Sequence, residues 1–132
     1  MIYELLRSDG SIVVNKNLAR NIGLEEAIVY SEILSRYFYF KNRGEMEGEW
    51  FYYKVEKMVE QTTINIKKQR KCITKLVELG LIDSKVRGVP AKRYFKVNED
   101  EAVLVNILNG KFVASKAKTT EQYRPKRPSL FQ

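Results

Sequence analysis

The chain has 132 residues, of which 44% are hydrophobic and 30% are charged, and its formal net charge at pH 7 is +8. This composition excludes an intrinsically disordered chain and is typical of one soluble domain with a modest core. The uninterrupted apolar runs are only a few residues long, which excludes a membrane-spanning helix, and the excess of positive charge favours a negatively charged partner.

The N-terminus is expected to form a β-hairpin. Two short apolar runs, Ile2–Leu6 and Ile12–Val14, flank the sequence SDGS. Asp-Gly is a frequent pair at the centre of a two-residue hairpin turn, so Asp9 and Gly10 are the predicted turn residues.

Two helices are predicted to follow. Asn15 is a good N-cap and Gly23 a good C-terminal residue for a helix over residues 16–22. A longer helix is expected from residue 24 to about residue 40, because acidic residues lie in its first turn and its apolar residues follow helical spacing. The predicted buried stripe of this helix contains Leu24, Ala27, Ile28, Ser31, Leu34 and Phe38.

The middle of the chain predicts a strand and two further helices. After a polar, glycine-containing loop, WFYY at residues 50–53 predicts a short aromatic strand, and residues 54–61 predict a short helix. A tight turn is then expected, with Ile64 inserted into the core. Asn65 is a good N-cap for a helix over residues 66–79, which is expected to end before Gly80.

The C-terminal third predicts a second hairpin, a helix and a tail. Two strand-like runs, residues 82–86 and 93–97, flank a turn that contains glycine and proline, and we expect the aromatic strand to pair with this hairpin. A C-terminal helix is expected over residues 99–110, and residues 111–132 are expected to form a basic, flexible tail. The predicted fold class is α+β, with one domain over residues 1–98.

The positive charge is concentrated in one part of the sequence. Residues 65–97 contain ten basic and two acidic side chains, whereas residues 1–64 contain eight basic and ten acidic ones. A one-sided basic surface indicates a polyanion such as nucleic acid. A solubilising charged face is the alternative that this distribution leaves open.

The helix over residues 66–79 is the predicted DNA-binding element. Gln69, Cys72, Ile73 and Leu76 share one face, which is expected to pack inward. Basic residues early in a helix oppose its dipole, so stability alone does not explain them. With the preceding helix and turn, the pattern predicts a helix-turn-helix whose second helix enters the major groove. The residues expected to contact DNA from this helix are Asn65, Lys67, Lys68, Arg70, Lys71 and Lys75.

The second hairpin, residues 82–97, is the predicted wing of this motif. Its basic side chains are expected to lie against the DNA backbone or the minor groove. These residues are Lys85, Arg87, Lys92 and Arg93. The fold predicted for the chain is therefore a winged helix-turn-helix that binds double-stranded DNA.

Enzymatic activity is not expected. The chain contains no histidine, so the commonest general base is missing and neither a Ser-His nor a Cys-His pair can form. It has no Walker-type glycine loop, and Glu45, Glu47 and Glu49 lack the spacing of a cation-binding loop. No cofactor and no metal are therefore expected. The single cysteine, Cys72, and the lack of a secretory leader favour a cytoplasmic protein.

Four segments in this order resemble one family. NLARNIGLEEAIVYSEILSRYF, GEWFYYKVEKMVEQ, TTINIKKQRKCITKLVELGLI and RYFKVN are similar to the winged-helix domain of phage and plasmid replication proteins. This group includes the N-terminal domains of DnaD-like replisome organisers and of plasmid replication initiators. The resemblance covers roughly residues 12–98 and implies duplex DNA binding in replication initiation or replisome organisation.

The sequence departs from the family pattern in three respects. Gln69 stands where the family usually has a β-branched residue, and Lys54 stands near where the family usually has a small N-cap. Such proteins also usually continue into a second domain, whereas this sequence continues into a short helix and a tail. Helicase loading and DNA remodelling are therefore not among the activities that the resemblance implies here.

Two other functions remain open at the level of the sequence. A winged-helix transcriptional regulator would bind duplex DNA with the same residues. A protein–protein interaction module of a replication complex would instead use the N-terminal hairpin and the aromatic helix. We also expect a homodimer, because two copies can bind two half-sites, with Ile2–Leu6, the helix from Leu24 and the segment 103–108 as candidate interfaces.

The predicted tail contains one possible partner-binding motif. Ser129, Leu130 and Phe131 resemble the end of the peptide with which bacterial replication proteins bind the sliding clamp. Arg127 stands in place of the leading glutamine of that motif. A tail that is disordered or packs on another partner is the alternative.

Overall fold

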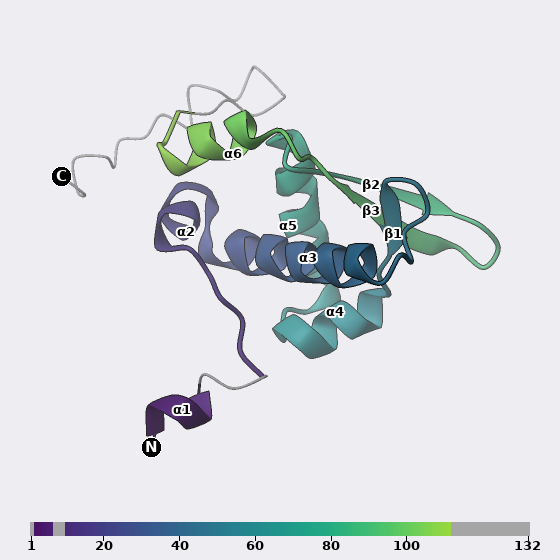
Figure 1. The fold of residues 1–132 in the computed structure, drawn as a ribbon, viewed down its shortest axis with the longest axis horizontal. Helices are drawn as coiled ribbons and strands as arrows, with labels where there is room; N and C mark the ends of the chain where they lie inside the picture. Colours follow the sequence, from purple (N-terminus) through teal and green to yellow (C-terminus); the bar gives the residue numbers. More distant parts are fainter. Residues whose placement is uncertain (1, 7–9, 112–132) are drawn as a thin grey trace.

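The computed structural model describes residues 2–6 and 10–111 (Figure 1). Residues 129–131 of the predicted clamp-binding motif, and most of the predicted basic tail, lie outside the described residues. The helices and strands, in chain order, are α1 (Ile2–Leu6), α2 (Lys16–Ile22), α3 (Leu24–Asn42), β1 (Trp50–Tyr52), α4 (Val55–Thr62), α5 (Ile66–Glu78), β2 (Ile82–Arg87), β3 (Lys92–Val97) and α6 (Glu101–Leu108). The α+β class predicted from the sequence is confirmed.

The helix ends follow the capping signals of the sequence. The side chains of Asn15 and Asn65 accept hydrogen bonds from Leu18 N (3.0 Å) and Lys68 N (2.9 Å), which fixes the starts of α2 and α5. Gly23 joins α2 to α3 at φ 112°, where a side chain would also collide with Glu26. These local signals explain why the predicted starts of both helices agree with the structure.

The sheet has three antiparallel strands in the order β1-β3-β2. Phe51 of β1 lies opposite Phe95 of β3, and Ser84 of β2 lies on the other side of Phe95. The aromatic strand therefore pairs with the C-terminal hairpin, as the sequence predicts. The hairpin extends away from the helices at one end of the molecule (Figure 1).

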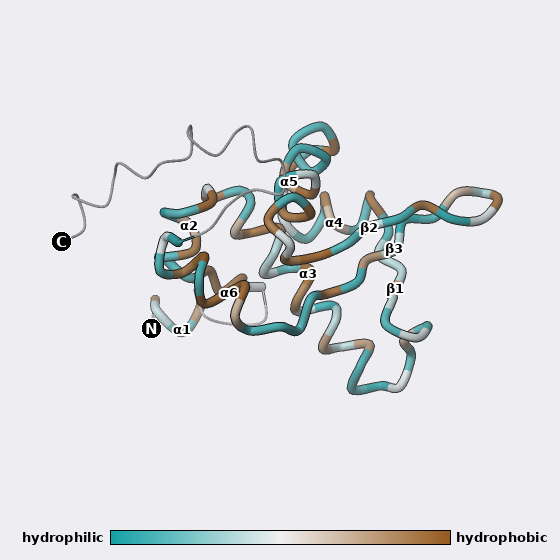
Figure 2. The backbone as a smooth tube through the Cα atoms, turned by 90° about the horizontal axis from the view of Figure 1, so that it is seen from above, coloured by the Kyte–Doolittle hydropathy of each residue, from teal (hydrophilic) through white to brown (hydrophobic). Residues whose placement is uncertain are grey.

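The core lies where α3 meets the other elements. This helix packs against α2, α4, α5 and β3, and α5 also packs against β2. Phe51, Phe95, Met58 and Leu76 are all at most 1% exposed. The outermost turns of α5 are mostly hydrophilic (Figure 2). The fold thus buries one face of α5 and leaves the other open to solvent.

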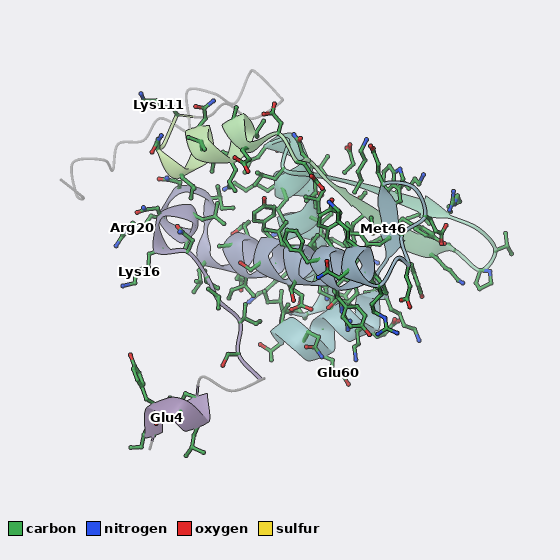
Figure 3. The ribbon with its side chains drawn as sticks, in the orientation of Figure 1. Glu4, Lys16, Arg20, Met46, Glu60 and Lys111 are labelled. Carbon is green, nitrogen blue, oxygen red and sulfur yellow. The ribbon has the colours of Figure 1, made fainter. Side chains whose placement is uncertain are left out.

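The predicted N-terminal hairpin is wrong. Ile2–Leu6 forms the helix α1, and residues 11–15 have no regular secondary structure. The apolar residues of Ile2–Leu6 do not alternate with polar ones, and Glu4, Leu5 and Leu6 favour helix. No residue of α1 is buried, and it lies apart from the rest of the protein, with Glu4 labelled in Figure 3.

The predicted buried stripe of α3 is partly wrong as well. Leu24 and Phe38 are 60% and 52% exposed. The buried residues of the helix are Ala27, Val29, Tyr30, Glu32, Ile33 and Tyr37. Because α3 is covered by helices and by the sheet on different sides, its buried arc is rotated from the stripe that spacing alone indicates.

The C-terminal helix is shorter than predicted. It covers Glu101–Leu108 rather than 99–110, because Asp100 is the N-cap and accepts a hydrogen bond from Ala102 N at 3.1 Å. Asn21 of α2 donates to the Ile107 carbonyl at 2.8 Å, which holds α6 against α2. Among residues 2–6 and 10–111, no helix is both long and apolar enough to cross a membrane.

Candidate nucleic-acid interface

A three-residue turn sets the angle between α4 and α5. Thr63 has the left-handed φ of 62°, and its N–H donates to the Val59 carbonyl at 2.7 Å. The hydroxyl of Thr62 donates to the Met58 carbonyl and accepts from Ile64 N. Ile64 is 7% exposed and lies in the core, as predicted. The turn is therefore fixed by its own hydrogen bonds and by one apolar anchor.

One face of α5 is buried and the other is basic. Gln69, Cys72, Ile73 and Leu76 are buried, which confirms the predicted inward face. The predicted DNA-contacting residues that are exposed on the opposite side are Asn65, Lys67, Lys68, Arg70 and Lys71. The structure therefore brings these residues together on one helix surface, which we call the α5 basic face.

The basic side chains of α5 differ in what they contact. In the described part of the chain, Lys67, Arg70 and Lys71 have no acidic partner within ion-pair distance. Lys68 lies 3.5 Å from Glu25 in an exposed ion pair, which contributes little to stability. Lys75 is half-buried and donates to the Ile22 carbonyl at 3.0 Å. Lys75 is therefore engaged in a contact between helices.

The side-chain amide of Asn65 already makes a hydrogen bond within the protein, so a DNA base would have to bind the same group. Its Oδ1 caps α5 by accepting the Lys68 N–H. A bidentate pair with adenine needs both the oxygen and the nitrogen of the amide. The cap thus occupies part of the group that sequence reasoning assigned to DNA.

Arg93 points inward rather than away from the hairpin. Its Nη2 donates to Gln69 Oε1 at 3.1 Å, and its guanidinium carbon lies 4.9 Å from the centroid of the Phe95 ring. Its Nε is buried without a hydrogen-bond partner among the described atoms. Burial lowers the pKa of Arg93 to about 10, and the positive charge of Arg70 acts in the same direction. Arg93 thus links β3 to α5.

Gln69 completes this buried link. It is 0% exposed, and its amide nitrogen donates to the carbonyls of Ile64 and Val55 at 3.3 and 3.4 Å. Gln69 therefore ties together α4, the turn, α5 and, through Arg93, the hairpin. The sequence places a polar residue on the inward face of α5, but only the structure shows its partners.

The other predicted wing residues lie on the outer side of the sheet. Lys85 Nζ is 4.0 Å from the Trp50 ring centroid, and Lys92 Nζ is 5.2 Å from that of Tyr52. Arg87 lies over Tyr94 and forms an ion pair with Glu47 at 2.9 Å. Sequence reasoning identified these cations but not the rings beneath them. The signal that was available is the alternation of side chains along a strand, which places Trp50 and Tyr52 on the opposite side of the sheet from Phe51.

The described residues contain no group of three or more histidine, cysteine, aspartate or glutamate side chains that could hold a metal ion. Cys72 is buried, and burial together with the charges of Glu26 and Glu25 raises the pKa of its thiol to about 11. The raised pKa keeps the buried Cys72 thiol protonated at neutral pH.

Two solved structures have a similar fold. One is described as "N-Terminal domain of DNA binding protein": its TM-score is 0.53 at 19% sequence identity, and the match covers 80% of this chain and 86% of that chain. The other is described as "Structure of Rep-DNA complex", with a TM-score of 0.54 at 18% identity over 67% of this chain and 75% of that chain. No protein-family model matches the sequence, and the search of curated proteins found no match. At these identities the likeness shows a shared fold.

Proposed function

We propose that this chain is a winged-helix protein that binds duplex DNA and acts in replication initiation or replisome organisation of a phage or plasmid. The observation that carries the proposal is the α5 basic face. Its cations Lys67, Arg70 and Lys71 are exposed after a tight turn and have no acidic partner among the described residues. Their mutual repulsion is a cost that a phosphate backbone would turn into affinity.

The geometry supports insertion of α5 into the major groove. The N-terminal end of the helix, from Asn65 to Lys71, is its exposed basic part, and in helix-turn-helix proteins this end contacts base edges. The link between Gln69 and Arg93 holds the hairpin to α5, so the hairpin can act as a wing at a fixed distance. In this role Lys85, Arg87 and Lys92 add contacts to phosphates, whereas Arg93 positions the wing.

The similar structures favour this function and this process. The words "DNA binding protein" and "Rep-DNA complex" describe those two proteins. Transferred to this chain, they support DNA as the ligand, and the second supports replication over regulation. We further propose that the protein has no enzymatic activity, needs no cofactor and works in the cytoplasm.

The salt dependence of duplex binding tests the proposal. Four cations of the α5 basic face would give a slope of log K against log salt of about −4, and Lys85 and Lys92 of the wing would bring it to about −5. Fluorescence anisotropy of a labelled duplex between low and moderate salt measures this slope. A slope near zero, or no binding at low salt, would contradict duplex binding. Footprinting on the DNA of the host element then separates an origin or repeat array from a promoter operator.

A further inference from the structure

The side of the sheet that faces away from the core carries aromatic rings as well as positive charge. Phe51 and Phe95 point into the core and are 1% and 0% exposed. Because side chains alternate along a strand, their neighbours lie on the opposite side. We call this side the outer sheet face and define it by Trp50, Tyr52, Tyr94, Lys85, Arg87 and Lys92.

The residues of the outer sheet face contact one another. The Tyr52 and Tyr94 rings are directly paired across the strands, with centroids 5.8 Å apart. A cation lies over each ring: Lys85 over Trp50, Arg87 over Tyr94 and Lys92 over Tyr52, at 4.0, 4.7 and 5.2 Å from the respective centroids. Trp50 and Tyr52 remain half-buried, so part of each is accessible to solvent.

We propose that the outer sheet face binds single-stranded DNA, with bases stacked on Trp50 and Tyr52 and phosphates bound by Lys85 and Lys92. This site is on a different element from the α5 basic face. It would give the protein a second ligand, an unpaired strand, in addition to the duplex of the proposed function.

The rings favour a single strand over a duplex. In a duplex the faces of the bases are stacked on one another, so protein rings cannot reach them without unstacking the helix. Trp50 and Tyr52 are two residues apart on one strand, a separation of roughly 7 Å. This is about twice the 3.4 Å rise per base of a duplex strand, so an extended single strand can place neighbouring bases on the two rings.

A base can displace the cation that lies over each ring. An exposed cation–π contact is weaker than the stacking of a base on an aromatic ring. Lysine side chains are long, so each displaced ammonium group can move to the adjacent phosphate. Lys85 and Lys92 have no acidic partner among the described residues.

The acidic residues near this face limit its charge. Arg87 is paired with Glu47, and Lys96 with Glu49, each at 2.9 Å. Only about two phosphate contacts are then expected, with a slope of log K against log salt of roughly −1.4 for a single strand. Binding to the outer sheet face should therefore depend on salt much less than binding to the α5 basic face.

The fluorescence of Trp50 reports directly on this site, because the chain contains one tryptophan. We expect a thymine oligomer of about twelve nucleotides to quench this fluorescence on titration into the intact protein. An abasic oligomer with the same number of phosphates should bind at least about tenfold more weakly. Equal binding of the two oligomers would show a charge-only contact and overturn the proposal, as would the absence of quenching.

Matched variants separate this site from the duplex site. Trp50→Leu should weaken binding of a labelled thymine oligomer by about tenfold while duplex affinity stays unchanged. Lys67→Glu/Lys71→Glu should weaken duplex binding and leave the affinity for the oligomer unchanged. Unchanged oligomer affinity in Trp50→Leu would contradict the proposal. Should that variant not fold, Tyr52→Leu replaces it, and oligomer affinity that is unchanged in Tyr52→Leu would again contradict the proposal. If the wild-type protein binds the oligomer but not the duplex, only the proposed function is refuted.

Discussion

Gln69 and Arg93 show how one residue pair connects the parts of the interface. The Gln69 side chain is fully buried, donates to two backbone carbonyls and accepts from Arg93. Arg93 is half-buried, and the hydrogen bond to Gln69 compensates part of the cost of removing its charge from water. The pair therefore couples the orientation of α5 to the position of the hairpin.

Removing one member of this pair should destabilise the fold. In Gln69→Leu the carbonyls of Ile64 and Val55 lose their donor and the half-buried Arg93 loses its acceptor. We expect the free energy of unfolding to fall by about 2 kcal/mol in urea denaturation at pH 7. The exposed neighbour Lys71→Ala should change it by less than about 0.5 kcal/mol.

The double variant Gln69→Leu/Arg93→Leu tests the reason for this loss. Replacing both partners by apolar groups removes the unpaired charge, so part of the lost stability should return. If the double variant loses as much stability as the two single variants together, the two side chains are not coupled.

The thiol of Cys72 should make stability depend on alkaline pH. Its pKa is raised from 9 to about 11 in the folded protein, so the folded state holds the proton more tightly than the unfolded state. This contribution to stability is complete below pH 9 and is lost as the pH rises through 11, by at most about 1.4 kcal/mol per pH unit. Denaturation of the wild type and of Cys72→Ala between pH 8 and 10.5 measures it. A slope equally steep in Cys72→Ala would assign the effect to other groups, such as Tyr53, whose pKa is also raised by burial.

The local signals of the sequence predicted where α2 and α5 begin, whereas the side-chain contacts of the wing residues could not be predicted from them. Asn15, Asn65 and Gly23 act within one turn of their own position, so the starts of α2 and α5 were predictable. The orientation of Arg93 and the rings beneath the wing cations depend on the register of β3 against β1 and β2. That register could not be predicted from the sequence alone.

The same limit explains the error at the N-terminus. The Asp-Gly pair resembles a hairpin turn, but a hairpin also needs two strands whose alternating side chains cover a core. Ile2–Leu6 lacks that alternation, and α1 buries no residue. A turn motif without patterned strands on both sides was insufficient to predict a hairpin.

The start of α5 offers a test of what Asn65 does. Asn65→Ala removes the cap and should lower the free energy of unfolding by about 1 kcal/mol, whereas Asn65→Ser keeps a capping oxygen and should be close to the wild type. If the amide also contacts a base, duplex affinity should fall in both variants. Unchanged affinity in Asn65→Ser would limit Asn65 to its capping role. Chemical denaturation and duplex titrations of the same samples give both readouts.

The prediction of a homodimer can be tested at α1. Ile2, Tyr3, Leu5 and Leu6 are each at least 70% exposed, which is costly for apolar side chains in water. We propose that α1 packs on a second copy of the chain. Sedimentation velocity should show a dimer that Leu5→Glu converts to a monomer. A wild-type monomer at the highest soluble concentration would contradict this proposal, and so would a Leu5→Glu dimer.

Two pairs of exposed lysines at different places on the molecule allow the position of charge to be tested. Lys67 and Lys71 are exposed on α5. Lys16 and Lys111 are also exposed, but lie at the end of the molecule formed by α2 and α6 (Figure 3). Reversing either pair changes the net charge by the same amount, so the comparison isolates position from total charge.

The duplex affinity of these two double variants shows whether α5 binds the DNA. We expect Lys67→Glu/Lys71→Glu to weaken binding by at least about tenfold at low salt with its fold intact by circular dichroism, and Lys16→Glu/Lys111→Glu to remain within about twofold of the wild type. Equal losses in the two variants, or wild-type affinity in Lys67→Glu/Lys71→Glu, would contradict the assignment of duplex binding to α5.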